Sequence, residues 1–141
     1  MVPSGCYRVD VHVACEQALA GYFICYSSAM ITYEDFEKVD IRVGRIVDIQ
    51  DFPEARKLAY KLRIDFGPEI GIKNSSVQAP GAHTKEELAG SLVCCVVNFP
   101  VKKVGPFESE VLTLGFRNAQ GEGWVLIGPK KDNVELGSKL Q

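Results

Sequence analysis

Apolar and polar residues alternate along several segments of the chain, which is the pattern of half-buried β-strands. The period of two is clearest in residues 59–66, AYKLRIDF, where aromatic and aliphatic positions alternate with lysine, arginine and aspartate. Apolar segments of strand length, separated by turn residues, also occupy 39–49, 69–73, 91–97 and 110–115. The pattern therefore predicts five strands, and GWVLIG at 123–128 predicts an accessory sixth that contains Trp124 as a core residue.

The first predicted strand, VDIRVGRIVDI, changes its apolar phase at Gly44. Apolar residues occupy every second position before this glycine and positions 46, 47 and 49 after it. A glycine at a phase change is typical of a β-bulge, so we expect the strand to bend there. In the third strand we expect the polar run Asn74, Ser75 and Ser76 to end the strand.

Two capping-box patterns predict short helices. Thr32 precedes Asp35 by three residues, and Thr84 precedes Glu87 by the same spacing. Gly90 is expected to end the second helix. Together, these elements predict an all-β protein with short helices, and specifically a five-stranded OB-fold barrel with an accessory C-terminal strand. OB-folds bind ligands across strands 2 and 3, between the loops that join strands 1 to 2 and 4 to 5.

Composition limits the classes of function. The 141 residues are 46% hydrophobic and 24% charged, which indicates one compact folded core rather than a disordered or membrane-embedded chain. The net charge of −2 gives no global attraction for polyanions, so a nucleic-acid site must be a local patch. The five cysteines lack CxxC spacing, which favours reduced thiols and a cytoplasmic protein; of the adjacent Cys94 and Cys95, one thiol should face inward and the other outward.

The sequence contains no motif that predicts catalysis, a metal or a cofactor. It lacks a phosphate-cradling glycine loop and a nucleophile motif, and His12 and His83 stand apart from other candidate ligands. We therefore expect a binding protein without enzymatic activity.

Residues 1–30 differ in composition from the rest and form an N-terminal extension of uncertain status, whereas 31–141 form the predicted domain. The extension is either an added strand or helix, or sequence upstream of a natural start at Met30. A signal peptide ending near Ala29 is a further alternative. The apolar run at 18–26 is too short to span a bilayer, so no membrane association is expected.

The two predicted ligand loops are 50–58 and 98–110, and they contain all the candidate binding residues except Arg42. Lys102 and Lys103, with Lys57 and Arg42 nearby in the predicted barrel, supply positive charges for phosphates. Asn98 and Ser109 can form hydrogen bonds with base edges or 2′-hydroxyls. Rings able to stack on bases are provided by Phe52, Phe99 and Phe107. The carboxylate of Glu110 opposes phosphate and could instead accept from an amine.

Each of these candidates also has a structural interpretation. The lysines could be solvated loop residues, Asn98 a turn former, and Arg42 the partner of an acidic neighbour. The three phenylalanines could close the barrel ends or a dimer contact.

Three blocks, DFEKVDIRVGRIV, FPEARKLAYKLRIDFGPEIGIKNSS and VVNFPVKKVGPFESEVLTLGF, resemble the tRNA-binding domain family, and most closely its stand-alone CsaA branch. The resemblance covers 31–141. It implies a non-catalytic OB-fold homodimer that binds tRNA or similar structured RNA and has a chaperone role for exported precursor proteins. The same module occurs in methionyl- and phenylalanyl-tRNA synthetases.

The resemblance also implies which residues bind RNA. Arg42, Asn98, Lys103 and Ser109 match the family's arginine, asparagine, basic and serine positions, and Lys57 occupies the basic position of the first loop. This chain departs from the general pattern where Glu110, Val111 and Leu112 stand in place of a Gly-Met pair, and where Pro106 shifts Gly105 by one position. Both departures favour the CsaA branch.

Two functions therefore compete. One is an RNA-binding module that uses the candidates above. The other is a secretion-related chaperone in which Phe52, Pro53, Phe99 and Phe107 line a groove for unfolded or precursor polypeptides.

Overall fold

The computed structural model describes residues 29–141, and the predictions for residues 1–28 lie outside this range. The chain divides into a unit that ends at Phe36 and a second unit, Glu37–Gln141. Helix α2 (Tyr33–Glu37) begins with the predicted capping box. Thr32 Oγ1 accepts a hydrogen bond from Asp35 N at 3.2 Å, and Thr32 N donates to Asp35 Oδ2 at 3.1 Å.

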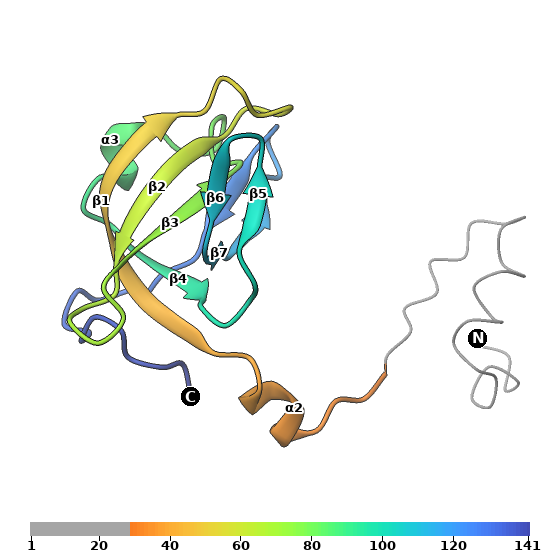
Figure 1. Ribbon diagram of the computed structural model, residues 1–141, viewed down its shortest axis with the longest axis vertical. Helices are drawn as coiled ribbons and strands as arrows, with labels where there is room; N and C mark the ends of the chain where they lie inside the picture. Colours follow the sequence, from red (N-terminus) through yellow and green to blue (C-terminus); the bar gives the residue numbers. More distant parts are fainter. Residues whose placement is uncertain (1–28) are drawn as a thin grey trace, which may run out of the picture. The chain divides into compact units, whose positions relative to one another are not determined.

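The second unit is built mainly of β-strands (Figure 1). In chain order its elements are β1 (Ile41–Asp51), β2 (Tyr60–Asp65), β3 (Ile72–Val77), α3 (Lys85–Leu88), β4 (Leu92–Val96), β5 (Lys102–Val104), β6 (Phe107–Ser109), β7 (Leu112–Thr113), β8 (Gly115–Arg117) and β9 (Trp124–Leu126).

Five strands form an antiparallel sheet in the order β3-β2-β1-β4-β7, which curls into a nearly closed barrel. Hydrogen bonds from Glu110 N to Asn74 O at 2.8 Å and from Ser75 Oγ to Val111 O at 3.1 Å join β3 to the segment that leads into β7. We call this junction the barrel seam. The five strands and the position of α3 between the third and fourth confirm the predicted OB-type fold.

Strand β1 is long and bent as expected, but the predicted bulge at Gly44 is wrong. Gly44 pairs regularly with Val93 of β4, and the register shift with β2 lies between Ile46 and Asp48. A Cβ atom on Gly44 would lie 2.5 Å from Ile64 Cγ2. The glycine therefore allows core side chains to pack directly on the strand backbone.

The polar run in β3 does not end the strand, which contradicts that prediction. Ser75 is fully buried, and its hydroxyl lies 2.8 Å from Thr113 Oγ1 in addition to its bond to Val111. A buried hydroxyl is tolerated when it has partners. Here the partners come from the segment that closes the barrel.

Helix α3 has the second predicted capping box, in which the Thr84 side chain accepts from Glu87 N and Thr84 N donates to the Glu87 carboxylate. The two cysteines of β4 face as predicted, with Cys95 fully buried and Cys94 half-buried. Burial raises the pKa of Cys95 to about 12, so its thiol is uncharged at neutral pH.

Two hairpins extend from the barrel, and neither was fully predicted. The connection 98–110 contains β5 and β6, joined by Gly105 and Pro106, and the φ of +59° at Gly105 suits the first central position of a type II′ turn. The predicted fifth strand is divided into β7 and β8, and β8 pairs with β9. Trp124 is 42% exposed on β9, so its predicted place in the core is wrong.

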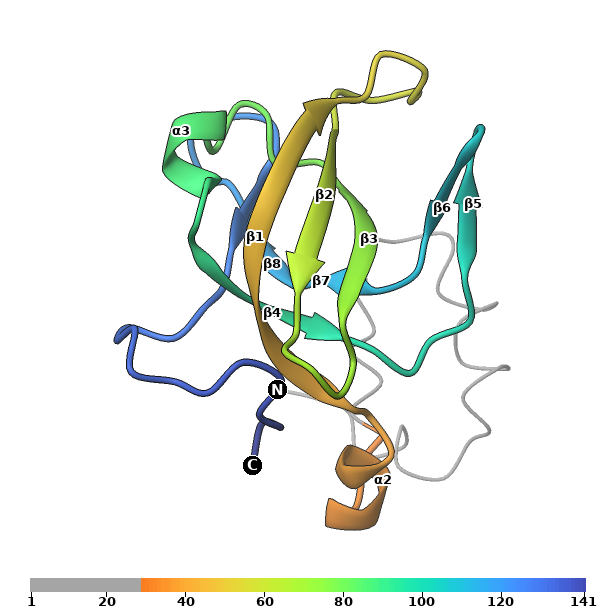
Figure 2. The same ribbon diagram turned by 60° about the vertical axis from the view of Figure 1, so that its left-hand side comes forward.

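The C-terminal segment covers one edge of β1 at a point that β2 does not reach (Figure 2). Gly137 N donates to Val43 O, and Leu140 N donates to Ile41 O, both at 2.8 Å. Among the described residues, no helix is long and apolar enough to cross a membrane.

Candidate nucleic-acid interface

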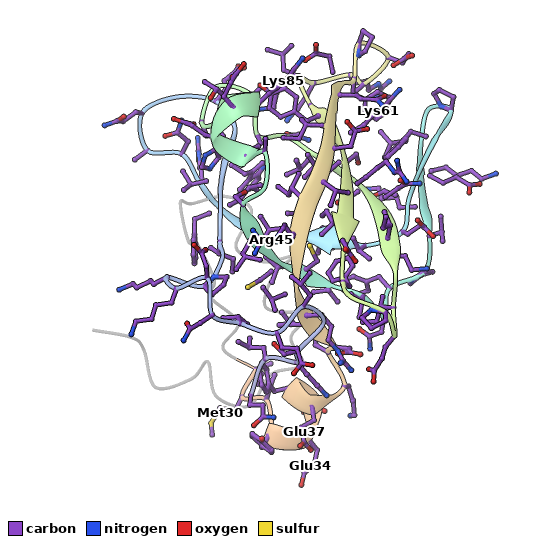
Figure 3. All side chains as sticks on the ribbon, turned by 90° about the vertical axis from the view of Figure 1, so that its left-hand side faces the viewer. Met30, Glu34, Glu37, Arg45, Lys61 and Lys85 are labelled. Carbon is purple, nitrogen blue, oxygen red and sulfur yellow. The ribbon has the colours of Figure 1, made fainter. Side chains whose placement is uncertain are left out.

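The two predicted ligand loops converge at one end of the barrel, as Figures 1 and 2 show. The ring centroids of Phe52, at the start of the β1–β2 loop, and Phe107, in the β5–β6 hairpin, are 5.5 Å apart in an edge-on arrangement. Lys61 Nζ lies 4.6 Å from the Phe52 centroid and 5.7 Å from that of Phe107. We call these three residues the loop junction. Figure 3 places Lys61 at the end of the barrel where β1 finishes.

Three predicted lysines are exposed on the two loops that meet at this junction. Lys57 lies on the β1–β2 loop, and Lys102 and Lys103 lie on β5. Lys103 Nζ is 3.9 Å from Glu108 Oε1 on the paired strand, in a solvent-exposed contact of little energetic weight. Within residues 29–141, Lys57 and Lys102 have no ion-pair partner. These ammonium groups are accessible to an anion.

Arg42 and Asn98 lie toward the opposite end of β1. Arg42 and Asp51 are nine positions apart on β1, a length of up to about 30 Å at about 3.3 Å per residue. Asn98 Oδ1 accepts from Asp40 N at 3.0 Å, and its Nδ2 donates to Lys38 O at 2.7 Å. The structure therefore does not bring these two residues to the loop junction.

The Arg42 guanidinium is already engaged by other groups of the protein. It donates to Asp40 Oδ1 at 2.6 Å and Oδ2 at 3.3 Å, and to Gly137 O at 2.8 Å. The hydrogen bond to Asp40 raises the pKa of Arg42. The acidic partner is two residues earlier on the chain, not across the sheet.

Ser109 and Glu110 hold the β5–β6 hairpin to β3. The buried Ser109 hydroxyl accepts from Ser76 N at 3.2 Å and donates to Val111 O at 3.2 Å. One carboxylate oxygen of Glu110 accepts from Asn74 N at 2.9 Å, and the other lies 3.6 Å from Lys73 Nζ. The polar groups of both residues are thus used within the barrel seam.

The predicted aromatic residues have unequal exposure. Phe52 is buried, with 3% of its surface exposed, and Phe107 is half-buried, whereas Phe99 is 52% exposed. Pro53 is exposed beside Phe52. Phe52 therefore closes the barrel end beneath the two loops, and Phe99 is the predicted ring with a face open to solvent.

Sequence reasoning missed a hollow that lies between the β1–β2 loop and the β8–β9 hairpin. It has a volume of about 640 Å³, and its lining includes Arg56, Lys57, Arg117 and Trp124. We call it the basic pocket. Arg56 adjoins a predicted residue, but Arg117 and Trp124 become neighbours only through the pairing of β8 with β9. Within residues 29–141, no group of three or more His, Cys, Asp or Glu side chains could hold a metal ion.

The barrel and its converging loops define a small OB-type binding module. The chain belongs to the putative tRNA binding domain family, which matches residues 41–139. The CsaA chaperone protein from Picrophilus torridus is 49% identical and superposes with a TM-score of 0.72, covering 79% of this chain and 100% of that one. For the CsaA chaperone from Bacillus anthracis the values are 41%, 0.72, 80% and 100%.

Methionine–tRNA ligases are also similar to this chain. The ligase of Thermococcus onnurineus is 34% identical over 79% of this chain, which corresponds to 14% of the ligase. The chain therefore spans a small part of the length of these relatives. These findings confirm the resemblance to the tRNA-binding domain family and its CsaA branch.

Proposed function

We propose that this protein is a non-catalytic RNA-binding module of CsaA type that binds tRNA or similar structured RNA through the β1–β2 loop and the β5–β6 hairpin. The observation that carries the proposal is the contact between Phe52 and Phe107, because it joins the loops that bear the exposed lysines. Family membership supports RNA as the ligand.

The predicted residues divide into two roles in this proposal. Lys57, Lys102 and Lys103 contact phosphates, since their ammonium groups face solvent. The remaining four position the surface: Asn98 fixes the start of the β4–β5 connection, Ser109 and Glu110 fix the hairpin on β3, and Arg42 fixes the C-terminal segment. Their hydrogen-bonding groups already have protein partners.

Charge reversal of the hairpin lysines tests the proposal. Lys102→Glu combined with Lys103→Glu should lower tRNA retention in a filter-binding assay at least tenfold, because two attractive contacts become repulsive. The matched control is the exposed adjacent pair Lys130→Glu and Lys131→Glu, which makes the same charge change outside these loops. Circular dichroism should show folded barrels in both variants. Equal retention by the two would remove the hairpin from the RNA site.

A second function is favoured by the exposed apolar residues that precede the hairpin. Phe99 and Val101 are 52% and 54% exposed, and two similar solved structures are CsaA chaperones. We propose that this stretch binds unfolded or precursor polypeptides together with the exposed Pro53, which follows the buried Phe52 in the sequence. Phe99→Ser with Val101→Ser should reduce suppression of client aggregation while tRNA retention persists; loss of both activities together would contradict separate contacts.

The assembly and location belong to the same proposal. We propose a cytoplasmic homodimer, in which two copies of the loop surface compensate for few contacts per copy through avidity. Sedimentation of the purified chain measures this directly, and a monomer at working concentration would contradict the avidity argument.

A further inference from the structure

The basic pocket combines positive charge with an exposed aromatic ring. Arg56, Lys57 and Arg117 line it together with the carboxylate-bearing Glu122, which gives a net formal charge of +2. Among the described residues, none of the three cations has an ion-pair partner. Trp124, 42% exposed, completes this part of the lining. The cations are therefore available to a ligand beside a ring face.

Hydrogen bonds and close backbone packing hold the β8–β9 hairpin that forms one side of the pocket. Trp124 N donates to Gln78 O at 2.8 Å, and Leu126 N donates to His83 Nε2 at 3.1 Å, so the β8–β9 hairpin is held against the segment after β3. A Cβ atom on Gly123 would lie 2.5 Å from Pro80 O, which shows how closely the two backbones approach. The backbone that carries Trp124 is thus held against this segment before any ligand binds.

The strand register places the ring and one cation together. Arg117 on β8 is the cross-strand partner of Trp124 on β9, and directly opposed residues have side chains on one face of the hairpin. Arg56 and Lys57 reach the same hollow from the β1–β2 loop. Cations around an aromatic face suit a ligand with both a planar ring and a phosphate.

We propose that the basic pocket binds a single unpaired nucleotide of the RNA, with its base on Trp124 and its phosphate among Arg56, Lys57 and Arg117; this rests on the proposed RNA-binding function. The volume of about 640 Å³ lies within the range of small-ligand pockets, about 300 to 1,000 Å³. A base inside a duplex has both faces covered, so stacking requires an unpaired one. Glu122 can accept from a base amine or a ribose hydroxyl.

The position of the pocket extends the proposed RNA surface. Lys57 is shared between the pocket and the loops that meet at the loop junction, so a bound strand could contact both. The structured part of the RNA then lies on the hairpin lysines, and an unpaired nucleotide enters the hollow. An acidic polypeptide would satisfy the cations but would leave the indole without a stacking partner.

Trp124 itself reports occupancy, because it is the single tryptophan of the chain. The test titrates the full-length protein with single-stranded tetra-adenylate and with bulk tRNA, following tryptophan fluorescence, while filter retention of tRNA is measured in parallel. Both RNAs should quench the fluorescence, and added salt should weaken the effect. Trp124→Ala should lower the affinity for tetra-adenylate about 5- to 100-fold by filter binding.

Charge variants make the test independent of the tryptophan. Arg117→Glu should abolish quenching by tetra-adenylate, whereas the control Lys131→Glu, an exposed lysine outside the pocket, should leave it unchanged. Circular dichroism checks that each variant is folded.

The outcomes separate this inference from the proposed function. The pocket would be overturned if the unmodified protein and Arg117→Glu retained tRNA equally and neither RNA quenched the tryptophan fluorescence. That result would leave RNA binding intact. If the unmodified protein did not retain tRNA, the proposed function would be overturned. The pocket would then stand if tetra-adenylate still quenched the tryptophan fluorescence, and it would fall if tetra-adenylate did not. Quenching by poly-glutamate but not by tetra-adenylate would also overturn the nucleotide assignment.

Discussion

Gly44 illustrates how one residue without a side chain determines the packing of the barrel. An added Cβ would meet Ile64 Cγ2 at 2.5 Å and Phe66 Cε1 at 2.8 Å, and both neighbours are almost fully buried. Gly44→Ala should therefore lower the free energy of unfolding by about 1 to 3 kcal/mol, as overpacked cores do. Urea denaturation measures the change. Val47→Ala, on an exposed side chain of the same strand, is the control and should have a smaller effect.

The polar candidate site residues could be recognised in the sequence, but their structural roles could not. Asn98 bonds to residues about 60 positions earlier, and Ser109 and Glu110 bond to residues more than 30 positions earlier. A single sequence does not reveal partners so far away in the chain. The family resemblance therefore identified these residues as candidates. The contacts that occupy their hydrogen-bonding groups became visible only in the folded structure.

At the scale of elements, the edge of β1 is protected by the C-terminal segment. Exposed strand edges invite pairing with other chains, and residues 137–140 cover the edge at Ile41–Val43. Arg42 adds a side-chain bond to Gly137 O while Asp40 holds its guanidinium in place. The arginine therefore connects the start of the first strand with the end of the chain.

Arg42→Ala tests this positioning role. Hydrogen bonds to charged groups contribute about 1.5 to 3 kcal/mol, so the variant should lose stability of this order, and the amides of Gly137 and Leu140 should exchange faster with solvent. Hydrogen exchange measured by NMR follows both amides. Arg63→Ala, an exposed arginine on β2, is the matched control. Unchanged exchange together with weaker tRNA retention would instead make Arg42 a direct RNA contact.

Elements with a clear apolar period were predictable, and those formed by polar or short segments were not. β2 and β4 were found at nearly their observed bounds because each buries alternate or successive apolar residues. The third strand was predicted at 69–73 but runs from Ile72 to Val77, because the first of these residues form a turn and because the buried serine depends on partners at the barrel seam. β5 and β6 have three residues each, too few for a period to show.

At the scale of the whole molecule, the proposed RNA binding must work against an unfavourable net charge. The chain carries 16 basic and 18 acidic residues, so attraction to a polyanion depends on where the basic groups gather. The loop lysines and the cations of the basic pocket come from separate parts of the chain, β5, the β1–β2 loop and β8. Only the fold brings Arg56 and Lys57 of the loop together with Arg117 of β8, which is why the pocket was not apparent from the sequence.

The salt dependence of binding follows from this arrangement. Each neutralised phosphate contributes about −0.7 to −0.9 to the slope of log K against log salt. Lys57, Lys102 and Lys103 therefore predict a slope of about −2 to −3, and contacts from Arg56 and Arg117 make it about −4. A filter-binding series with bulk tRNA across salt concentrations measures the slope. Arg117→Glu should make the slope shallower by the contribution of at least about one phosphate contact, whereas Lys131→Glu should leave it unchanged.

Polypeptide held by Phe99 and Val101 should bind with little salt dependence, because apolar burial is not screened. A flat slope for tRNA would show that phosphates do not drive the association, and it would leave the apolar stretch as the surface that binds.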